Sequence, residues 1–170
     1  MATIVTPDFI KNSFQNLARS NRFTVVFDSP NESGTDALYI ACRRAKWPYL
    51  SLSTATVKYQ GPSFQVPYEQ ILEEVHLDFF IDDEFNNYNF FKNWFEKILD
   101  PKTKDFEFLA NYGQDVQIFQ LDSNGETIDN VKLLNAYPKT ISEIDFAHDN
   151  DNEIQTFNVS FVYDGLEFGS

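Results

Sequence analysis

The sequence has few of the residues that build covalent frameworks or metal sites. Its 170 residues include one cysteine, Cys42, which excludes an internal disulfide framework and a multi-cysteine zinc site. The two histidines, His76 and His148, lie far apart and are typical of surface residues rather than ligands or bases. Glycine-rich phosphate loops and nucleophile elbows are also missing. We therefore expect a protein that is not an enzyme and that needs no metal or cofactor.

Long apolar runs are missing as well. The longest are only a few residues, such as Phe79–Ile81, whereas a membrane-spanning helix needs about 18 or more. Residues Met1–Asn12 lack the basic start and apolar stretch of a secretory leader. These features predict that the protein is made in a cytoplasm and does not insert stably into a membrane.

Aromatic residues are abundant: 18 Phe, 8 Tyr and 2 Trp make up 16% of the chain. Each ring system buries about 150–250 Å², so a chain of this length forms one sizeable core. This composition excludes intrinsic disorder despite a formal charge of −13. We expect a single domain over residues 1–170.

Charge is divided unevenly along the chain. Met1–Tyr68 holds four acids and seven bases, a balance of +3, whereas Glu69–Ser170 holds 22 acids and six bases, a balance of −16. Two interpretations account for this asymmetry. Either an acidic surface keeps the protein soluble, or oppositely charged surfaces meet between copies of the chain. Arg43, Arg44 and Lys46 form a cluster too small for a nucleic-acid footprint.

Alternating apolar and polar residues predict antiparallel strands around one helix. In Glu73–Asp82, for example, Val75, Leu77, Phe79 and Ile81 face inward while His76, Asp78 and Asp82 face out. The turn Ser123-Asn124-Gly125 is typical of a hairpin. The other predicted strands are Asn21–Asp28, Ala37–Ala45, Asp115–Leu121, Thr127–Leu134, Thr140–Phe146 and Ile154–Tyr163. The sum is a mainly β protein, an antiparallel β-sandwich or small barrel with one flanking α-helix.

The internal helix is predicted over residues 84–99. Phe91, Trp94, Phe95 and Ile98 recur at helical spacing, and Pro101 lies just beyond the end. An N-terminal segment, residues 1–20, precedes the first strand. Its Thr6-Pro7 pair predicts a short helix over Pro7–Ala18.

An extended hairpin is predicted over residues 50–68. Ser51–Tyr59 and Ser63–Pro67 flank the turn at Gly61-Pro62. The hairpin contributes little to the core, yet it carries aromatic and branched residues, and a hairpin alone in water is marginally stable. We expect its apolar residues to contact another subunit: Val57, Tyr59, Phe64 and Val66.

Two strands lack the residues that normally protect sheet edges. Ile154–Tyr163 contains no Lys, Arg or Pro, and Gln117 and Gln120 give Asp115–Leu121 a similar neutral character. Such strands lie either in the middle of a sheet or against a neighbouring subunit. Copies joined head to tail form rings or filaments.

The chain resembles the tail tube proteins of contractile-tailed, myovirus-type bacteriophages. The likeness covers nearly the whole chain and is strongest in its C-terminal part. It rests on Asn21–Val25, Cys42 with Ala45 before Trp47-Pro48, Val57–Gly61 with Val66-Pro67, Glu74–Leu77, Phe90–Trp94, Asn135–Pro138, Ile144-Asp145, and Asp151–Phe157 with Val159. The helix Phe85–Leu99 is more aromatic than that family leads one to expect.

The resemblance implies that six copies form a ring in which each contributes strands to a continuous inner β-barrel. Rings stack into a hollow tube inside a contractile sheath, which conducts DNA into the host cell. The implied partners are further copies, the tail sheath protein, and baseplate and tail-terminator proteins. The implied location is the virion tail, assembled in the host cytoplasm.

A tube of this kind repels phosphates from a bore lined by carboxylates or neutral polar groups, so genomic DNA passes without specific binding. We expect Gln117, Asn158 and Ser160 to lie near the lumen or at a seam between subunits. Three alternatives remain: a baseplate component that starts the tube, the tube of a related injection device that carries effectors, and a monomeric β-barrel that encloses an apolar ligand.

Overall fold

The computed structural model describes residues 18–27, 42–146 and 154–169. The predicted helix Pro7–Ala18 and the residue His148 lie outside the described residues, apart from Ala18 itself. The elements are β1 (Phe23–Phe27), β2 (Cys42–Ala45), β3 (Leu50–Lys58), β4 (Ser63–Leu72), β5 (Val75–Phe80), α2 (Asn86–Ile98), α3 (Leu109–Tyr112), β6 (Gln114–Leu121), β7 (Thr127–Ile141), β8 (Thr156–Val162) and β9 (Gly165–Phe168).

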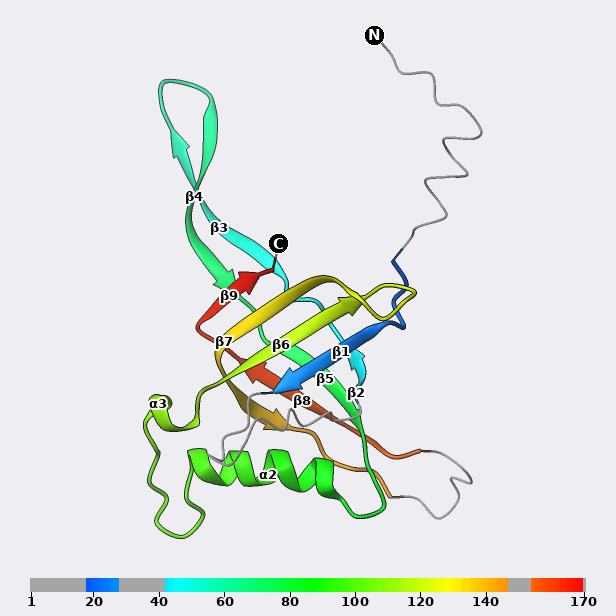
Figure 1. Ribbon diagram of the computed structural model, residues 1–170. Coiled ribbons are helices and arrows are strands. Elements are labelled where there is room, and N and C mark those ends of the chain that lie inside the picture. Colours follow the sequence, from blue (N-terminus) through cyan, green and yellow to red (C-terminus); the bar gives the residue numbers. More distant parts are fainter. Residues whose placement is uncertain (1–17, 28–41, 147–153, 170) are drawn as a thin grey trace, which may run out of the picture.

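Seven strands form one antiparallel sheet in the order β1-β6-β7-β8-β5-β2, with β9 added beside β7. The long strand β7 belongs to two halves of this sheet. Its first part pairs with β6 and β9, and its second part pairs with β8. We call β1-β6-β7-β9 sheet A and β7-β8-β5-β2 sheet B. Because Cα atoms of β1 and β2 approach within 8 Å, the sheet curls into a partly closed barrel (Figure 1).

The interior of the barrel is filled with aromatic rings. Phe27 from β1 lies edge-on to Phe91 and Trp94 of α2, at ring-centroid distances of 5.6 and 6.3 Å. Phe91 also lies 4.8 Å from Phe79 and 6.0 Å from Phe161. Helix α2 therefore joins sheet A to sheet B through one ring cluster, which confirms the predicted mainly β body with a flanking helix.

The helix α2 begins at Asn86, two residues after the predicted start. Phe85 has a left-handed backbone with φ of 58°, and the Asp82 carboxylate accepts a hydrogen bond from the Asn87 N–H at 3.2 Å. This turn directs the chain from β5 into the helix. Phe91, Trp94 and Ile98 are buried as expected, whereas Phe95 is 37% exposed.

The C-terminal part of the chain departs from the prediction in two ways. The strand predicted at Thr140–Phe146 is the end of β7, which runs without interruption to Ile141. A short strand that the alternation pattern did not reveal, β9, follows Asp164 and pairs with β7. β9 is only four residues long and follows the polar turn residue Asp164. A strand this short shows too few alternations to be recognised from the sequence.

The different burial of two phenylalanines on α2 predicts different effects on stability when each is replaced. Phe91→Ala removes a fully buried ring from the cluster, so we expect it to lower the free energy of unfolding by about 3–5 kcal/mol. Phe95→Ala, one turn further along and partly exposed, is the matched control with a smaller loss. Urea unfolding of both variants measures the difference, and equal losses would contradict the assignment of Phe91 to the core.

A second prediction concerns Tyr163, whose hydroxyl is buried without a hydrogen-bond partner among the described residues. Burial raises the pKa of this phenol, and the charge of Glu73 adds to the effect. An unsatisfied buried hydroxyl costs about 1–3 kcal/mol, so we expect Tyr163→Phe to raise the free energy of unfolding by about 1 kcal/mol. Tyr59→Phe at an exposed position is the control. A destabilised Tyr163→Phe variant would show that the hydroxyl has a partner.

Candidate assembly surfaces

The hairpin β3–β4 extends away from the barrel as a separate two-stranded ribbon (Figure 1). Its turn follows the predicted Gly61-Pro62 site, where Gln60 and Gly61 have φ of 47° and 130°. Every residue of β4 is exposed. β4 runs to Leu72, four residues beyond the predicted end of the hairpin at residue 68. The described residues supply no core for the ribbon.

The four residues predicted to contact another subunit all lie exposed on this ribbon. Val57 pairs with Phe64, and Val66 pairs with Ala55. Directly opposed residues share a face of the sheet, so Val57, Phe64 and Val66 form one apolar face near the tip. The exposed fractions are 49% for Val57, 72% for Tyr59, 57% for Phe64 and 47% for Val66.

At the base of the ribbon the apolar face is on the opposite side. A bulge at Tyr68 lies between the pairs Ser53–Glu69 and Thr54–Pro67. On the barrel side of this bulge, Leu50 is opposite Leu72, and Leu52 follows Leu50 on the same face. These leucines are also exposed. The ribbon thus presents apolar side chains on one face at its tip and on the other at its base.

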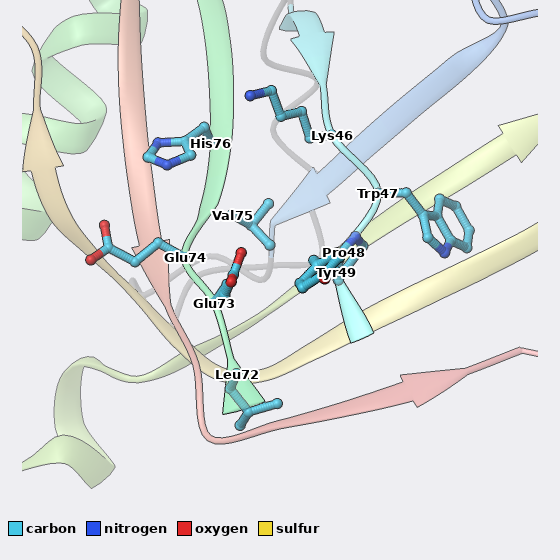
Figure 2. A pocket seen from close by; sticks show the side chains of 9 residues that line it. All are labelled: Lys46, Trp47, Pro48, Tyr49, Leu72, Glu73, Glu74, Val75 and His76. Atoms are coloured by element: carbon cyan, nitrogen blue, oxygen red, sulfur yellow. The ribbon is translucent and has the colours of Figure 1, made fainter. Parts of the chain in front are cut away.

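A hollow of about 670 Å³ lies where the ribbon joins the barrel. Figure 2 shows that its walls come from two short stretches, Lys46–Tyr49 between β2 and β3, and Leu72–His76 from the end of β4 into β5. The walls combine exposed rings of Trp47 and Tyr49 with the carboxylates of Glu73 and Glu74. His76 lines this hollow as a surface residue, as the sequence predicted.

The structure brings two of the three predicted lumen or seam residues together. Asn158 and Ser160 lie two positions apart on β8, on the face of sheet B opposite to the core residues Phe157, Val159 and Phe161. Ser160 is nevertheless buried, with 4% of its surface exposed, whereas Asn158 is half-buried. Asn158 donates a hydrogen bond to Asp78 at 2.6 Å. On the same face Lys139 donates to Glu74, which lowers the pKa of the Glu74 carboxyl.

Gln117 lies elsewhere. It belongs to β6 in sheet A, where Val116 and Ile118 face the core. Its register partners are Val26 on β1 and Lys132 on β7. Because sheets A and B face each other across the core, Gln117 points away from the molecule on the side opposite to Asn158 and Ser160. One flat surface does not contain all three residues.

The two strands that lack edge protection are interior strands. β6 pairs with β1 and β7, and β8 pairs with β5 and β7. Their neutral faces are thus explained within one chain, and the alternative that these strands pair with a neighbouring subunit is wrong. The free edges lie at other strands, which the sequence patterns did not identify.

Cys42 is a half-buried free cysteine. Burial raises the pKa of the Cys42 thiol to about 12, opposed in part by a backbone hydrogen bond with Arg44, so this cysteine carries almost no thiolate at neutral pH. In the described part of the chain, no cluster of three His, Cys, Asp or Glu side chains could hold a metal ion.

No helix among the described residues is long and apolar enough to cross a membrane.

Known proteins resemble this chain in sequence and in fold. In the curated relative "Baseplate tail-tube junction protein gp54" of Enterobacteria phage T4, 112 residues align at 24% identity. The aligned part is 66% of this chain but 34% of the relative, so the chain spans about a third of the relative's length.

Solved structures share the fold at low sequence identity. The sheath/tube terminator of the extracellular contractile injection system PVC superposes with a TM-score of 0.71 at 15% identity, over 92% of this chain and 99% of that chain. A chain of the PVC sheath–tube complex gives a TM-score of 0.70 at 14% identity, over 97% and 99%. The family model described as "Phage tail tube protein" matches residues 5–167. The chain therefore belongs to the phage tail tube protein family.

Proposed function

We propose that this chain is the repeating structural subunit of a virion tail tube. Six copies close a ring, and stacked rings form a hollow conduit inside a contractile sheath. The observation that carries this proposal is the ribbon β3–β4, whose exposed apolar residues find no core among the described residues. Apolar side chains at such a density are typical of a surface that another molecule covers.

The partners follow from the same assembly. Further copies of the chain cover the ribbon, the sheath protein surrounds the tube, and baseplate and terminator proteins cover its ends. The resemblance to sheath–tube and terminator structures supports this set. The subunit acts by shape and surface charge, and we assign it no catalytic activity. Its place is the virion tail, and assembly occurs in the host cytoplasm.

The formal charge of −13 supports passage of DNA without specific binding. A ring of six copies carries a large excess of negative charge, which repels phosphates at short range. A related injection device that carries effectors would use a tube of the same fold. DNA as the cargo is therefore part of this proposal and does not follow from the fold.

A second candidate is a subunit that starts or ends the tube rather than repeating along it. The T4 relative is a junction protein and one matching structure is a terminator. The two candidates differ in assembly, since a repeating subunit grows into rods whereas an end subunit stops at a ring. A monomeric ligand-binding barrel is less well supported, because rings such as Phe27, Phe79 and Phe91 occupy the barrel interior.

The proposal predicts the effect of charges on the ribbon. Val57→Asp with Phe64→Asp places two carboxylates on the apolar face near the tip, so we expect rings and rods to be lost. The stability of the single chain is expected to change by less than about 0.5 kcal/mol, since both residues are exposed. Light scattering and negative-stain microscopy measure assembly, and urea unfolding measures stability.

The neighbouring cross-strand pair provides a matched control. Thr56 is opposite Gln65 on the other face of the same ribbon, so Thr56→Asp with Gln65→Asp adds the same charges without touching the apolar face. We expect this variant to assemble. Equal assembly of both variants, or an unmodified chain that stays monomeric at high concentration, would contradict the proposed function.

A further inference from the structure

The turn between β6 and β7 carries a motif that the proposed function does not use. Asn124 is the only asparagine in the sequence that precedes a glycine. Asn124 and Gly125 both lie exposed in this turn, at one end of the sheet (Figure 1). Because glycine has no side chain to shield its backbone nitrogen, this nitrogen is open to contact with the side-chain amide of the preceding asparagine.

The surroundings of Gly125 leave its backbone nitrogen accessible. The φ of Gly125 is 84°, and a Cβ built on it would have no described atom within 4 Å. The Gly125 N–H donates to the Asp122 carbonyl at 3.4 Å, whereas ordinary N–H···O bonds measure about 2.7–3.2 Å. The turn therefore holds this nitrogen only weakly.

The side chain of Asn124 is held by a neighbouring carboxylate. Asn124 Nδ2 donates to Asp122 Oδ2 at 3.3 Å, and the Asn124 N–H donates to Asp122 Oδ1 at 2.6 Å. Asp122 Oδ1 also accepts a hydrogen bond from the Glu126 N–H at 3.0 Å. Aspartate side chains commonly organise turns through such bonds to the following backbone. Here the same bonds restrain the Asn124 amide on the side of Asp122.

We propose that Asn124-Gly125 is a site of deamidation through a succinimide, and that the Asp122 carboxylate slows this reaction. The Gly125 nitrogen gives its proton to a base in solution and forms a bond to the Asn124 Cγ. The bond from Cγ to Nδ2 breaks, and Nδ2 takes up a proton and leaves as ammonia. No atom is oxidised or reduced. The product is a ring that joins the Asn124 side chain to the Gly125 nitrogen.

Water then opens the ring at one of its two carbonyl carbons. Release of the nitrogen from Cγ gives aspartate, whereas release from the backbone carbonyl carbon gives isoaspartate, whose chain runs through the side chain. Either product adds a negative charge beside Asp122 and Glu126. Isoaspartate also lengthens the backbone of the turn by one carbon atom. The modification therefore changes the charge and the geometry of the turn that joins β6 to β7.

The chain contains its own comparison at Asp164-Gly165. Aspartate before glycine also forms a succinimide, but Gly165 begins β9 and lies opposite Leu134 of β7. The Asp164 N–H donates to the Leu134 carbonyl at 3.0 Å, and the Asp164 carboxylate accepts a hydrogen bond from Asn135 at 3.3 Å. This pair is held in the sheet, and a carboxylate is attacked by nitrogen less readily than an amide. We therefore expect Asp164 to stay unmodified while Asn124 reacts.

Peptide mapping by mass spectrometry tests the site on the whole folded chain. The purified protein is incubated in mildly alkaline water enriched in a heavy oxygen isotope, and it is then digested in ordinary water. Heavy oxygen at position 124 marks deamidation during the incubation and excludes deamidation during digestion. We expect labelled aspartate and isoaspartate at Asn124, formed about tenfold or more faster than at the exposed Asn111, since the side chain of Tyr112 hinders the approach of its nitrogen.

Two variants separate the motif from its restraint. Gly125→Asn retains a residue that tolerates the left-handed conformation, but its side chain shields the nitrogen, so we expect labelled product at Asn124 to fall by about tenfold or more. Asp122→Ala removes the bonds that hold the Asn124 amide. We expect it to raise the rate by about five- to tenfold, the effect of one net hydrogen bond on a barrier. The unmodified chain unfolded in urea loses the same bonds, and we expect a similar increase.

The outcomes are distinct. Absence of labelled product at Asn124, or a rate equal to that at Asn111, would overturn the modification site. An unchanged rate in a folded Asp122→Ala variant would overturn the restraint by Asp122, and so would equal rates in the folded and the urea-unfolded chain. None of these results bears on tube assembly, which the charged ribbon variants test separately.

Discussion

The contact on which the structure depends is the cluster of rings between α2 and the two halves of the sheet. Phe27, Phe79, Phe91, Trp94 and Phe161 come from four separate elements, and their rings lie within about 6 Å of one another in pairs. This cluster completes the barrel inside a single chain. The ribbon β3–β4 lies outside this cluster, and none of its described residues belongs to the core.

The division between body and surface has a physical reason. Interior strands of the sheet bury one face against the rings and satisfy their backbone groups on both sides. The two strands of the ribbon pair only with each other, so each leaves backbone groups open along its outer edge, and most of its apolar side chains are exposed. β1 and β9 also have one unpaired edge among the described residues, but Val25, Phe27 and Leu166 pack in the core. The ribbon therefore lacks both the apolar and the hydrogen-bonded contacts that strands of the body make.

Much of this arrangement could be predicted from the sequence. The alternation of Val75, Leu77 and Phe79 identified the buried face of β5, and Gly61-Pro62 identified the turn of a ribbon without a core. The resemblance to tail tube proteins correctly indicated the family. What local patterns do not contain is the order of strands in a sheet. The absence of Lys, Arg and Pro in β8 left its edges open for a partner, yet long-range pairing with β5 and β7 fills both edges.

The predicted surfaces show the same limit. Alternation separates the two faces of a strand, so it placed Gln117, Asn158 and Ser160 on faces away from the core. It does not say that β6 and β8 belong to opposite layers, and this is why the three residues do not share one surface. The exposure of Val57 and Phe64 followed from composition alone, since the ribbon lacked the residues needed to fill a core.

The bulge at Tyr68 has a consequence for what can cover the ribbon. The apolar side chains lie on one face at the tip and on the other face at the base. No single flat surface therefore covers both groups at once. A molecule that covers them wraps around the ribbon, or two molecules approach it from opposite sides.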